Sequence, residues 1–214
     1  MASKRRKNNA KFKWTKELII LIVAIIAIVA TTIVMSIPSE KEKYTKELNN
    51  AIYMANVNSS QGENPTNYST LPTDNVFSEV NHKNLLKKIN KEEYVYVLYG
   101  SLNNSIVLAN LSVINSVCTE EEIKNVYIYS SLWVEETEDL ETETFKEKQS
   151  AIEADLNSKK SKDVEEFTLL EYPALLVFKD GELIFNTQSY EDINDKVSWS
   201  VYIQKAFMLS KNNE

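Results

Sequence analysis

The feature that most constrains this chain is an uncharged, strongly apolar run near its N-terminus. The run covers twenty residues, from Leu18 to Ile37, and Pro38 follows it directly. At about 1.5 Å per residue, a helix of this length covers the hydrocarbon core of a bilayer, which is about 30 Å thick. The run therefore predicts a transmembrane helix at 18–37, through which the chain contacts the lipid bilayer.

Charges on the two sides of the run predict its orientation. Seven basic residues and one acid, Glu17, lie in residues 1–17, which carry +7 − 1 = +6. The whole chain carries −7, so everything beyond residue 17 carries −13. By the positive-inside bias, residues 1–17 are expected to form a basic cytoplasmic tail of a single-pass cell-membrane protein with an extracytoplasmic C-terminal domain. The acidic C-terminal part also argues against nucleic acid as a partner, because that needs a basic surface.

A cleaved signal peptide and a buried core helix are the alternatives to a membrane anchor. A signal peptide has a shorter apolar region that ends in a small-residue cleavage site. Here the run is long and leads into Ser36-Ile37-Pro38-Ser39, without an A-x-A pattern. We therefore expect an uncleaved signal anchor. Abundant Asn, Lys and Ile beside only three Gly and four Pro suggest a low-GC Gram-positive bacterium.

Residues 38–75 are predicted to be a juxtamembrane segment and linker. A short helix is expected over 39–57, with Tyr44, Leu48, Ile52 and Met54 as its apolar positions. Residues 58–75 are rich in Ser, Asn, Thr and Pro, which is linker composition. The folded domain is expected to begin near Val76.

From Val76 onward, short apolar runs alternate with amphipathic segments. Residues 94–99 (YVYVLY) contain no polar break, as is typical of a strand buried on both faces. This alternation predicts a parallel core sheet with helices on both faces. Lys179-Asp180-Gly181 predicts an antiparallel hairpin at the sheet edge. The expected strands are 76–80, 94–99, 125–129, 174–178 and 182–185, and the expected helices are 81–90, one after residue 103, a charged insertion at about 135–162, and 190–209.

Two of these segments resemble the thioredoxin superfamily, and the resemblance covers residues 76–211. YVYVLYG, followed by a short loop and an amphipathic helix, is similar to the family's central strand and active-site helix. EYPALLVFKDGELI is similar to the family's cis-proline segment and hairpin. The resemblance implies an α/β fold with a mixed sheet flanked by helices. The apolar run and the Tyr99-Gly100 pair are most similar to bacteriocin transport accessory proteins of Gram-positive bacteria.

The chain departs from the family at the redox site. Counted from Gly100, the family's Cys-x-x-Cys falls at Asn104-Ser105-Ile106-Val107, which holds no cysteine. Thioredoxin chemistry needs a reactive thiolate and a second, resolving thiol. Asn104 is better interpreted as a helix N-cap and Val107 as a packing residue. We therefore expect no catalytic residue and no cofactor.

Two further residues could carry chemistry. Cys118 is the only cysteine and lies in phase with Val107, Leu111 and Ile114, so it is either a buried small hydrophobe or an accessible single thiol. His82 is the only histidine, and without a second histidine or a nearby cysteine it is expected on the surface and not in a metal site.

Pro173 is the remaining candidate. The resemblance implies a cis Tyr172–Pro173 bond and a peptide groove formed by Tyr172, Pro173, Asn104 and Ser105. A bound polypeptide would pair with a sheet edge, as in β-augmentation. The expected function is a redox-inactive, membrane-anchored module that binds a protein or peptide partner in export or envelope assembly. The alternatives are an oxidoreductase acting through Cys118 and a self-associating structural membrane subunit.

Overall fold

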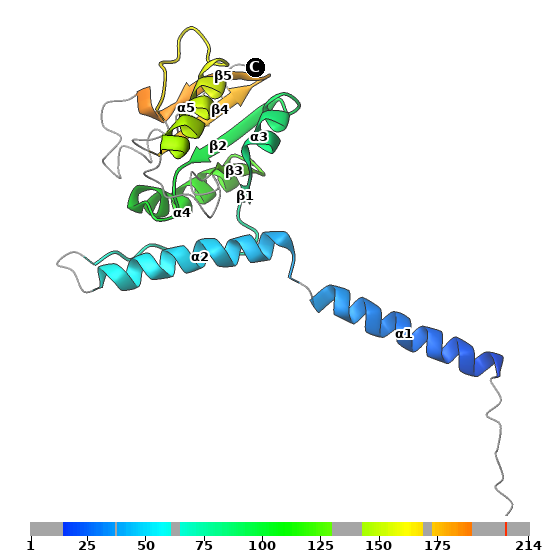
Figure 1. Ribbon diagram of the computed structural model, residues 1–214. Helices are drawn as coiled ribbons and strands as arrows, with labels where there is room; N and C mark the ends of the chain where they lie inside the picture. The colour runs from blue at the N-terminus through cyan, green and yellow to red at the C-terminus, as the bar shows by residue number, and fades with distance from the viewer. Residues whose placement is uncertain are drawn as a thin grey trace, which may run out of the picture. The chain divides into compact units, whose positions relative to one another are not determined.

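The computed structural model describes residues 15–36, 38–60, 65–129, 143–168, 173–189 and 204. Every structural statement below concerns these residues. The chain divides into two compact units, Met1–Ser39 and Glu40–Glu214 (Figure 1). Each unit is described by itself.

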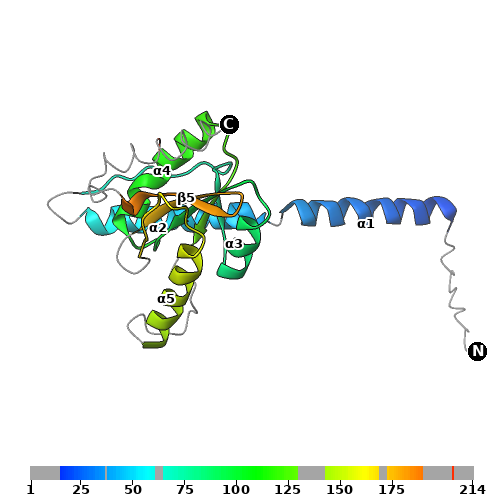
Figure 2. The same ribbon diagram turned by 90° about the horizontal axis from the view of Figure 1, so that it is seen from above.

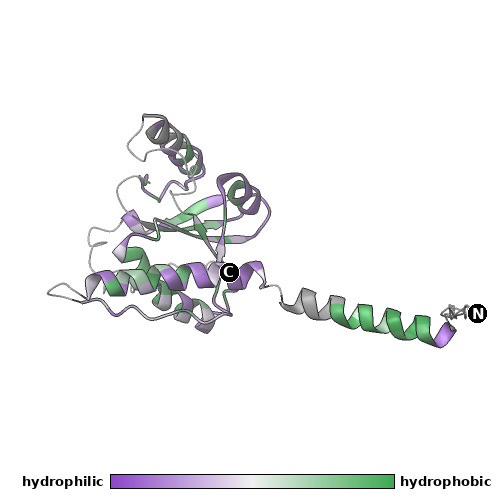
Figure 3. Cartoon of the chain, turned by 60° about the horizontal axis from the view of Figure 1, so that its bottom comes forward, coloured by the Kyte–Doolittle hydropathy of each residue, from purple (hydrophilic) through white to green (hydrophobic). Residues whose placement is uncertain are grey.

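The first unit contains α1, Lys16–Ser36, so the helix expected over the apolar run is present. Its residues are hydrophobic over most of its described length (Figure 3). Large side chains such as Ile20 and Ile28 are exposed by 69% and 66%. None of the helices in the described ranges combines the length and the apolar character that crossing a membrane requires.

The second unit begins with α2, Glu40–Ser59. The predicted inward positions Tyr44, Leu48 and Ile52 are buried, whereas Met54 is exposed. Tyr44, Leu48 and Ile52 belong to the same hydrophobic cluster as residues of the sheet. The interpretation of residues 38–75 as a linker is therefore wrong for residues 40–59, because the apolar stripe of α2 supplies part of the domain core.

Residues 65–75 are also part of the domain, although their composition is that of a linker. Asn49 of α2 accepts a hydrogen bond from the backbone N–H of Leu71 at 2.7 Å and donates one to its carbonyl at 2.9 Å. Asn56 holds the backbone of Tyr68 in the same way, at 2.8 and 2.9 Å. The side-chain amides thus provide the partners that a sheet would otherwise provide, and polar composition alone does not reveal this.

Five strands form one sheet in the order β1-β3-β2-β4-β5 (Figure 1). β1 and β2 pair with β3 in parallel, while β4 runs antiparallel to both β2 and β5. The predicted mixed sheet flanked by helices is confirmed, and so is the antiparallel hairpin with β5 at the edge. The strands are β1 Phe77–Glu79, β2 Tyr94–Tyr99, β3 Val126–Tyr129, β4 Ala174–Lys179 and β5 Glu182–Asn186.

Helices cover both faces of this sheet. On one face, called the α2 face below, α2 and α4 (Ser105–Glu120) pack against alternate strand residues such as Tyr96 and Leu98. On the other, called the α3 face, α3 (His82–Ile89) and α5 (Glu143–Asn157) pack against Val95, Val97 and Tyr99. α3 and α5 lie near one another in both ribbon views (Figures 1 and 2). The charged helix expected within 135–162 is thus partly confirmed as α5, while residues 130–142 and the helix expected at 190–209, apart from residue 204, lie outside the described residues.

The packing of α2 gives a direct test on two apolar positions of one helix. Leu48→Ala should lower the free energy of unfolding by about 2–5 kcal/mol, because Leu48 is fully buried among sheet residues. Met54→Ala is the matched control and should change stability by less than about 0.5 kcal/mol, since Met54 is 47% exposed. Urea unfolding of the full chain, followed by circular dichroism, measures both. Equal effects would show that α2 does not belong to the core.

Candidate functional site

The candidate site lies where β2 ends and α4 begins. Residues 101–104 form the turn, in which the N–H of Asn104 donates to the carbonyl of Ser101 at 2.9 Å. The side chain of Asn104 accepts hydrogen bonds from the N–H groups of Ile106 and Val107 at 2.8 and 3.3 Å. Asn104 is therefore the N-cap of α4, as predicted, and satisfies donors that the first turn leaves free.

Gly100 brings the proline segment and α4 together. β2 and β4 pair Tyr99 with Ala174, which places Gly100 beside Pro173 at the end of the ladder. A Cβ atom on Gly100 would lie 2.6 Å from Cγ2 of Val107 and 3.0 Å from Cβ of Pro173. Only glycine fits this approach, so residue 100 is a structural requirement of the site that the sequence alone does not reveal.

Three of the four predicted groove residues, Asn104, Ser105 and Pro173, lie in the described part of the chain. Asn104 is half-buried and caps α4, Ser105 is exposed in its first turn, and Pro173 is buried against Gly100. Tyr172 and the Tyr172–Pro173 bond lie outside the described residues, so the cis bond stays a prediction. The exposed residues of this site are Asn103 and Ser105, whereas Val107 and Pro173 are buried.

The N-terminus of α4 carries the positive end of the helix dipole, and its first turn contains no acidic side chain. This end of the helix therefore favours neutral or anionic groups. Positions 104 and 107 provide no thiol, because Asn104 is the helix cap and Val107 is fully buried and packs against Gly100.

Cys118 lies near the other end of α4. Its side chain is fully buried in the cluster of the α2 face, and burial raises the pKa of the thiol to about 12. A thiol with so high a pKa holds almost no thiolate at neutral pH. Of the two interpretations left open by the sequence, the structure favours the small hydrophobic residue.

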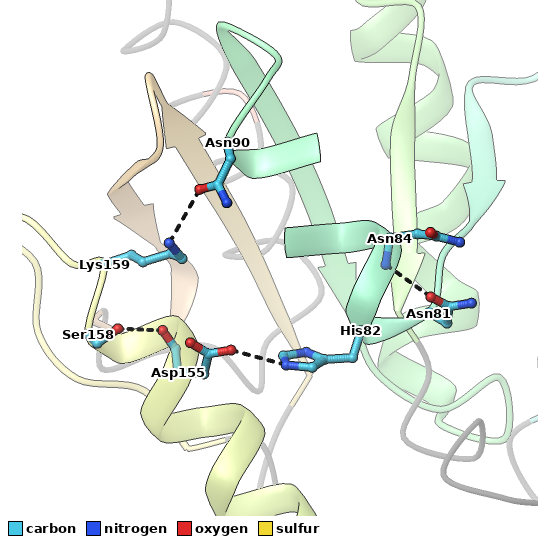
Figure 4. A network of polar contacts seen from close by, with 7 residues as sticks. All are labelled: Asn81, His82, Asn84, Asn90, Asp155, Ser158 and Lys159. Carbon is cyan, nitrogen blue, oxygen red and sulfur yellow. Dashed lines mark hydrogen bonds and ion pairs between the residues drawn. The ribbon is translucent and has the colours of Figure 1, made fainter. Parts of the chain in front are cut away.

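His82 has a structural role that the sequence does not reveal. It is partly buried, with Nε2 3.1 Å from Oδ2 of Asp155 (Figure 4). Nearby, Nζ of Lys159 lies 3.5 Å from Oδ1 of Asn90, so two polar contacts join the α3 region to the end of α5. The side chain of His82 is 30% exposed, so it lies at the surface as expected, and tertiary packing brings Asp155 to it across 73 positions. Within the described ranges, no group of three or more His, Cys, Asp or Glu side chains is placed to hold a metal ion.

Comparison with known proteins gives likenesses only at the level of the fold, among solved structures. No protein-family model matches the chain, and no curated protein matches it. Among solved structures, one described as a candidate oxidoreductase with a thioredoxin fold aligns with a TM-score of 0.38 and 18% sequence identity. The alignment covers 59% of this chain and 93% of that chain. The fold assignment rests on the strand order and pairing given above.

The contact at Gly100 can be tested by a double-mutant cycle. Gly100→Ala should destabilise the full chain by about 1–3 kcal/mol, because the new methyl group overlaps Val107 and crowds Pro173. Val107→Ala removes the atom that is 2.6 Å away. The double variant should therefore be more stable than the sum of the two single effects, by about 0.5 kcal/mol or more. Strictly additive effects in urea unfolding would contradict the proposed contact.

Proposed function

We propose that this chain is a redox-inactive, thioredoxin-like binding module that is held at a membrane by its N-terminal helix. The observation that carries the proposal is the α4 N-terminus, where Asn104 acts as a cap and where Val107 and Pro173 both pack against Gly100. In redox-active members of the thioredoxin superfamily the two corresponding positions hold cysteine thiols. Here they hold Asn104 and Val107, which have no redox chemistry.

The surface beside Pro173 is the part proposed to bind. Asn103 and Ser105 are exposed at the turn into α4, while Val107 and Pro173 are buried. A rigid support with exposed polar groups lowers the entropic cost of binding. We infer that the ligand is a protein or an extended peptide, in keeping with the role that the resemblance implies for the proline segment. A role in export or envelope assembly follows from the proposed location.

The proposed anchor rests on sequence patterns. Residues 18–37 are uncharged and mainly apolar, and the preceding basic residues predict that the N-terminus stays in the cytoplasm. Eight large apolar side chains in the described part of α1 are exposed. A lipid environment would remove that surface from water.

The two alternative functions have less support. An oxidoreductase acting through Cys118 needs an accessible thiolate, and this thiol is fully buried with a pKa raised to about 12. A self-associating structural subunit would use α1 or the charged insertion, and it would not need the supported turn at the start of α4.

Site-specific crosslinking tests the binding proposal. A photoreactive residue in place of Ser105 should capture a protein or peptide in the native cell, because Ser105 is exposed in the first turn of α4, where the ligand is proposed to bind. The control replaces Glu120, which is exposed at the opposite end of the same helix, and should give no such adduct. Equal adducts at both positions, or none at 105, would contradict a binding surface at the start of α4.

Labelling with a membrane-impermeant maleimide tests the proposed location. Asn103→Cys should react in intact cells, whereas Ser3→Cys should react only after the cells are permeabilised. The wild type is the control, because its single thiol, Cys118, is fully buried and should react only in denaturant. Labelling of Ser3→Cys but not Asn103→Cys in intact cells would reverse the orientation. Fast labelling of the native wild-type protein would support the alternative of an oxidoreductase acting through Cys118.

A further inference from the structure

The exposed apolar side chains of the second unit are confined to one helix. Among the described residues of this unit, large hydrophobic side chains are exposed at Tyr53, Met54 and Val57, by 60%, 47% and 40%. All three belong to α2 and lie within five consecutive positions. Single exposed hydrophobic residues are ordinary on a protein surface, whereas a group of them in one place marks a contact surface.

These residues lie on the side of α2 that faces away from the domain core. Lys46, Asn50, Tyr53 and Val57 are exposed at steps of four, three and four residues, which is the spacing of one helix face, and Met54 lies beside them. The buried stripe of α2 is on the opposite side and packs in the core of the α2 face. We call the five exposed residues the outer stripe of α2.

The chain leads into α2 directly from the helix that is proposed to enter the membrane. α1 ends at Ser36 and α2 begins at Glu40. A fully extended chain covers about 3.3–3.6 Å per residue, so the connection from Ser36 to Glu40 spans at most about 14 Å. The headgroup region on each side of the hydrocarbon core is about 5–8 Å thick. With α1 inserted up to its end, the first turn of α2 therefore lies at or just above the lipid headgroups.

The composition of the outer stripe fits a bilayer interface. Tyrosine is enriched at the membrane–water interface, where its ring enters the apolar layer while its hydroxyl stays in water. Met54 and Val57 add apolar surface, and the stem of Lys46 can lie along lipid while its ammonium group stays among the headgroups. Contact with lipid would remove the apolar surface of the stripe from water. The buried stripe of α2 would keep its contacts with the sheet, so the domain would not have to change its fold.

The charges of α2 do not favour lipid of either kind. Residues 40–47 contain three glutamates and three lysines, so the charged part of the helix is neutral overall. Electrostatic attraction to an anionic membrane needs an excess of basic residues. The attraction to lipid therefore has to come from the burial of apolar surface, and it should not require anionic lipid.

We propose that the outer stripe of α2 lies on the surface of the bilayer that holds α1, with Tyr53, Met54 and Val57 at the boundary between headgroups and acyl chains. α2 then runs along the membrane, and the sheet lies on the side of α2 that faces away from lipid. This inference rests on the proposed membrane anchor and adds a second lipid contact to it. A domain held at two places has a fixed orientation on the membrane, so the site at the start of α4 faces a constant direction.

Fluorescence quenching by lipid tests the proposal, with the full chain reconstituted in phosphatidylcholine vesicles. An NBD fluorophore is attached to one introduced cysteine, and nitroxide-labelled phosphatidylcholine is the quencher. Cys118 is fully buried and stays unlabelled. We expect strong quenching at Asn50→Cys, in the outer stripe, and none at Ala154→Cys, an exposed position of α5 on the opposite face of the sheet. Ile26→Cys, in α1, reports on the anchor itself and should be quenched.

The labelled positions separate the contact of α2 from the anchor. Quenching at Ile26→Cys without quenching at Asn50→Cys would overturn the contact of α2 while leaving the anchor intact. Absence of quenching at Ile26→Cys would overturn the anchor and the contact together. A blue-shifted signal at Asn50→Cys that the nitroxide lipid does not quench would show that protein, such as a second copy of the chain, covers the outer stripe. That result would also overturn the proposal.

Polar substitutions show whether apolar burial is the cause. Tyr53→Gln, Met54→Gln and Val57→Gln together should lower the ratio of lipid-bound to free α2 by about tenfold or more, because three apolar side chains lose their burial in lipid. The melting temperature should stay unchanged, since all three residues are exposed. Lys43→Gln with Lys46→Gln is the matched control and should leave quenching unchanged, as should the addition of phosphatidylglycerol. Equal quenching in the triple variant and the wild type, or quenching only with phosphatidylglycerol, would overturn the proposal.

Discussion

Burial of β2 on both faces is the constraint on which the rest of this domain depends. Its six residues alternate between the two hydrophobic clusters, with Tyr96 and Leu98 on the α2 face and Val95, Val97 and Tyr99 on the α3 face. The strand is also paired on both edges, to β3 and to β4. Because β2 is packed on both faces and paired on both edges, the backbone at its C-terminal end has little conformational freedom. The candidate site begins at that end.

That rigidity fixes the geometry of the candidate site. The end of β2 places Gly100 beside Pro173, and the turn that follows delivers Asn104 to the first position before α4. Asn104 provides the helix cap, and Val107 provides a packing contact against Gly100. These contacts are requirements of the fold, so they hold the site in place whatever it binds.

α2 contributes both to the domain core and to a cavity beside β1. Its apolar stripe completes the core of the α2 face, while its charged residues line the cavity, namely Glu40, Lys41, Lys43 and Glu47. The ring of Tyr44 packs in the core, and its buried hydroxyl has no hydrogen-bond partner among the described residues.

Local patterns in the sequence determined the helices and strands. Uninterrupted β-forming runs predicted β2 and β3, Asn104 identified itself as an N-cap, and Lys179-Asp180-Gly181 predicted the hairpin, because each depends on neighbours within a few residues. The sequence alone also shows that positions 104 and 107 hold no cysteine. Only the tertiary structure decided that α2 and residues 65–75 belong to the domain, that Asp155 partners His82, and that a methyl group cannot fit on Gly100. These features depend on residues tens of positions apart, and no local pattern encodes which distant side chains meet when the chain closes around its central strand.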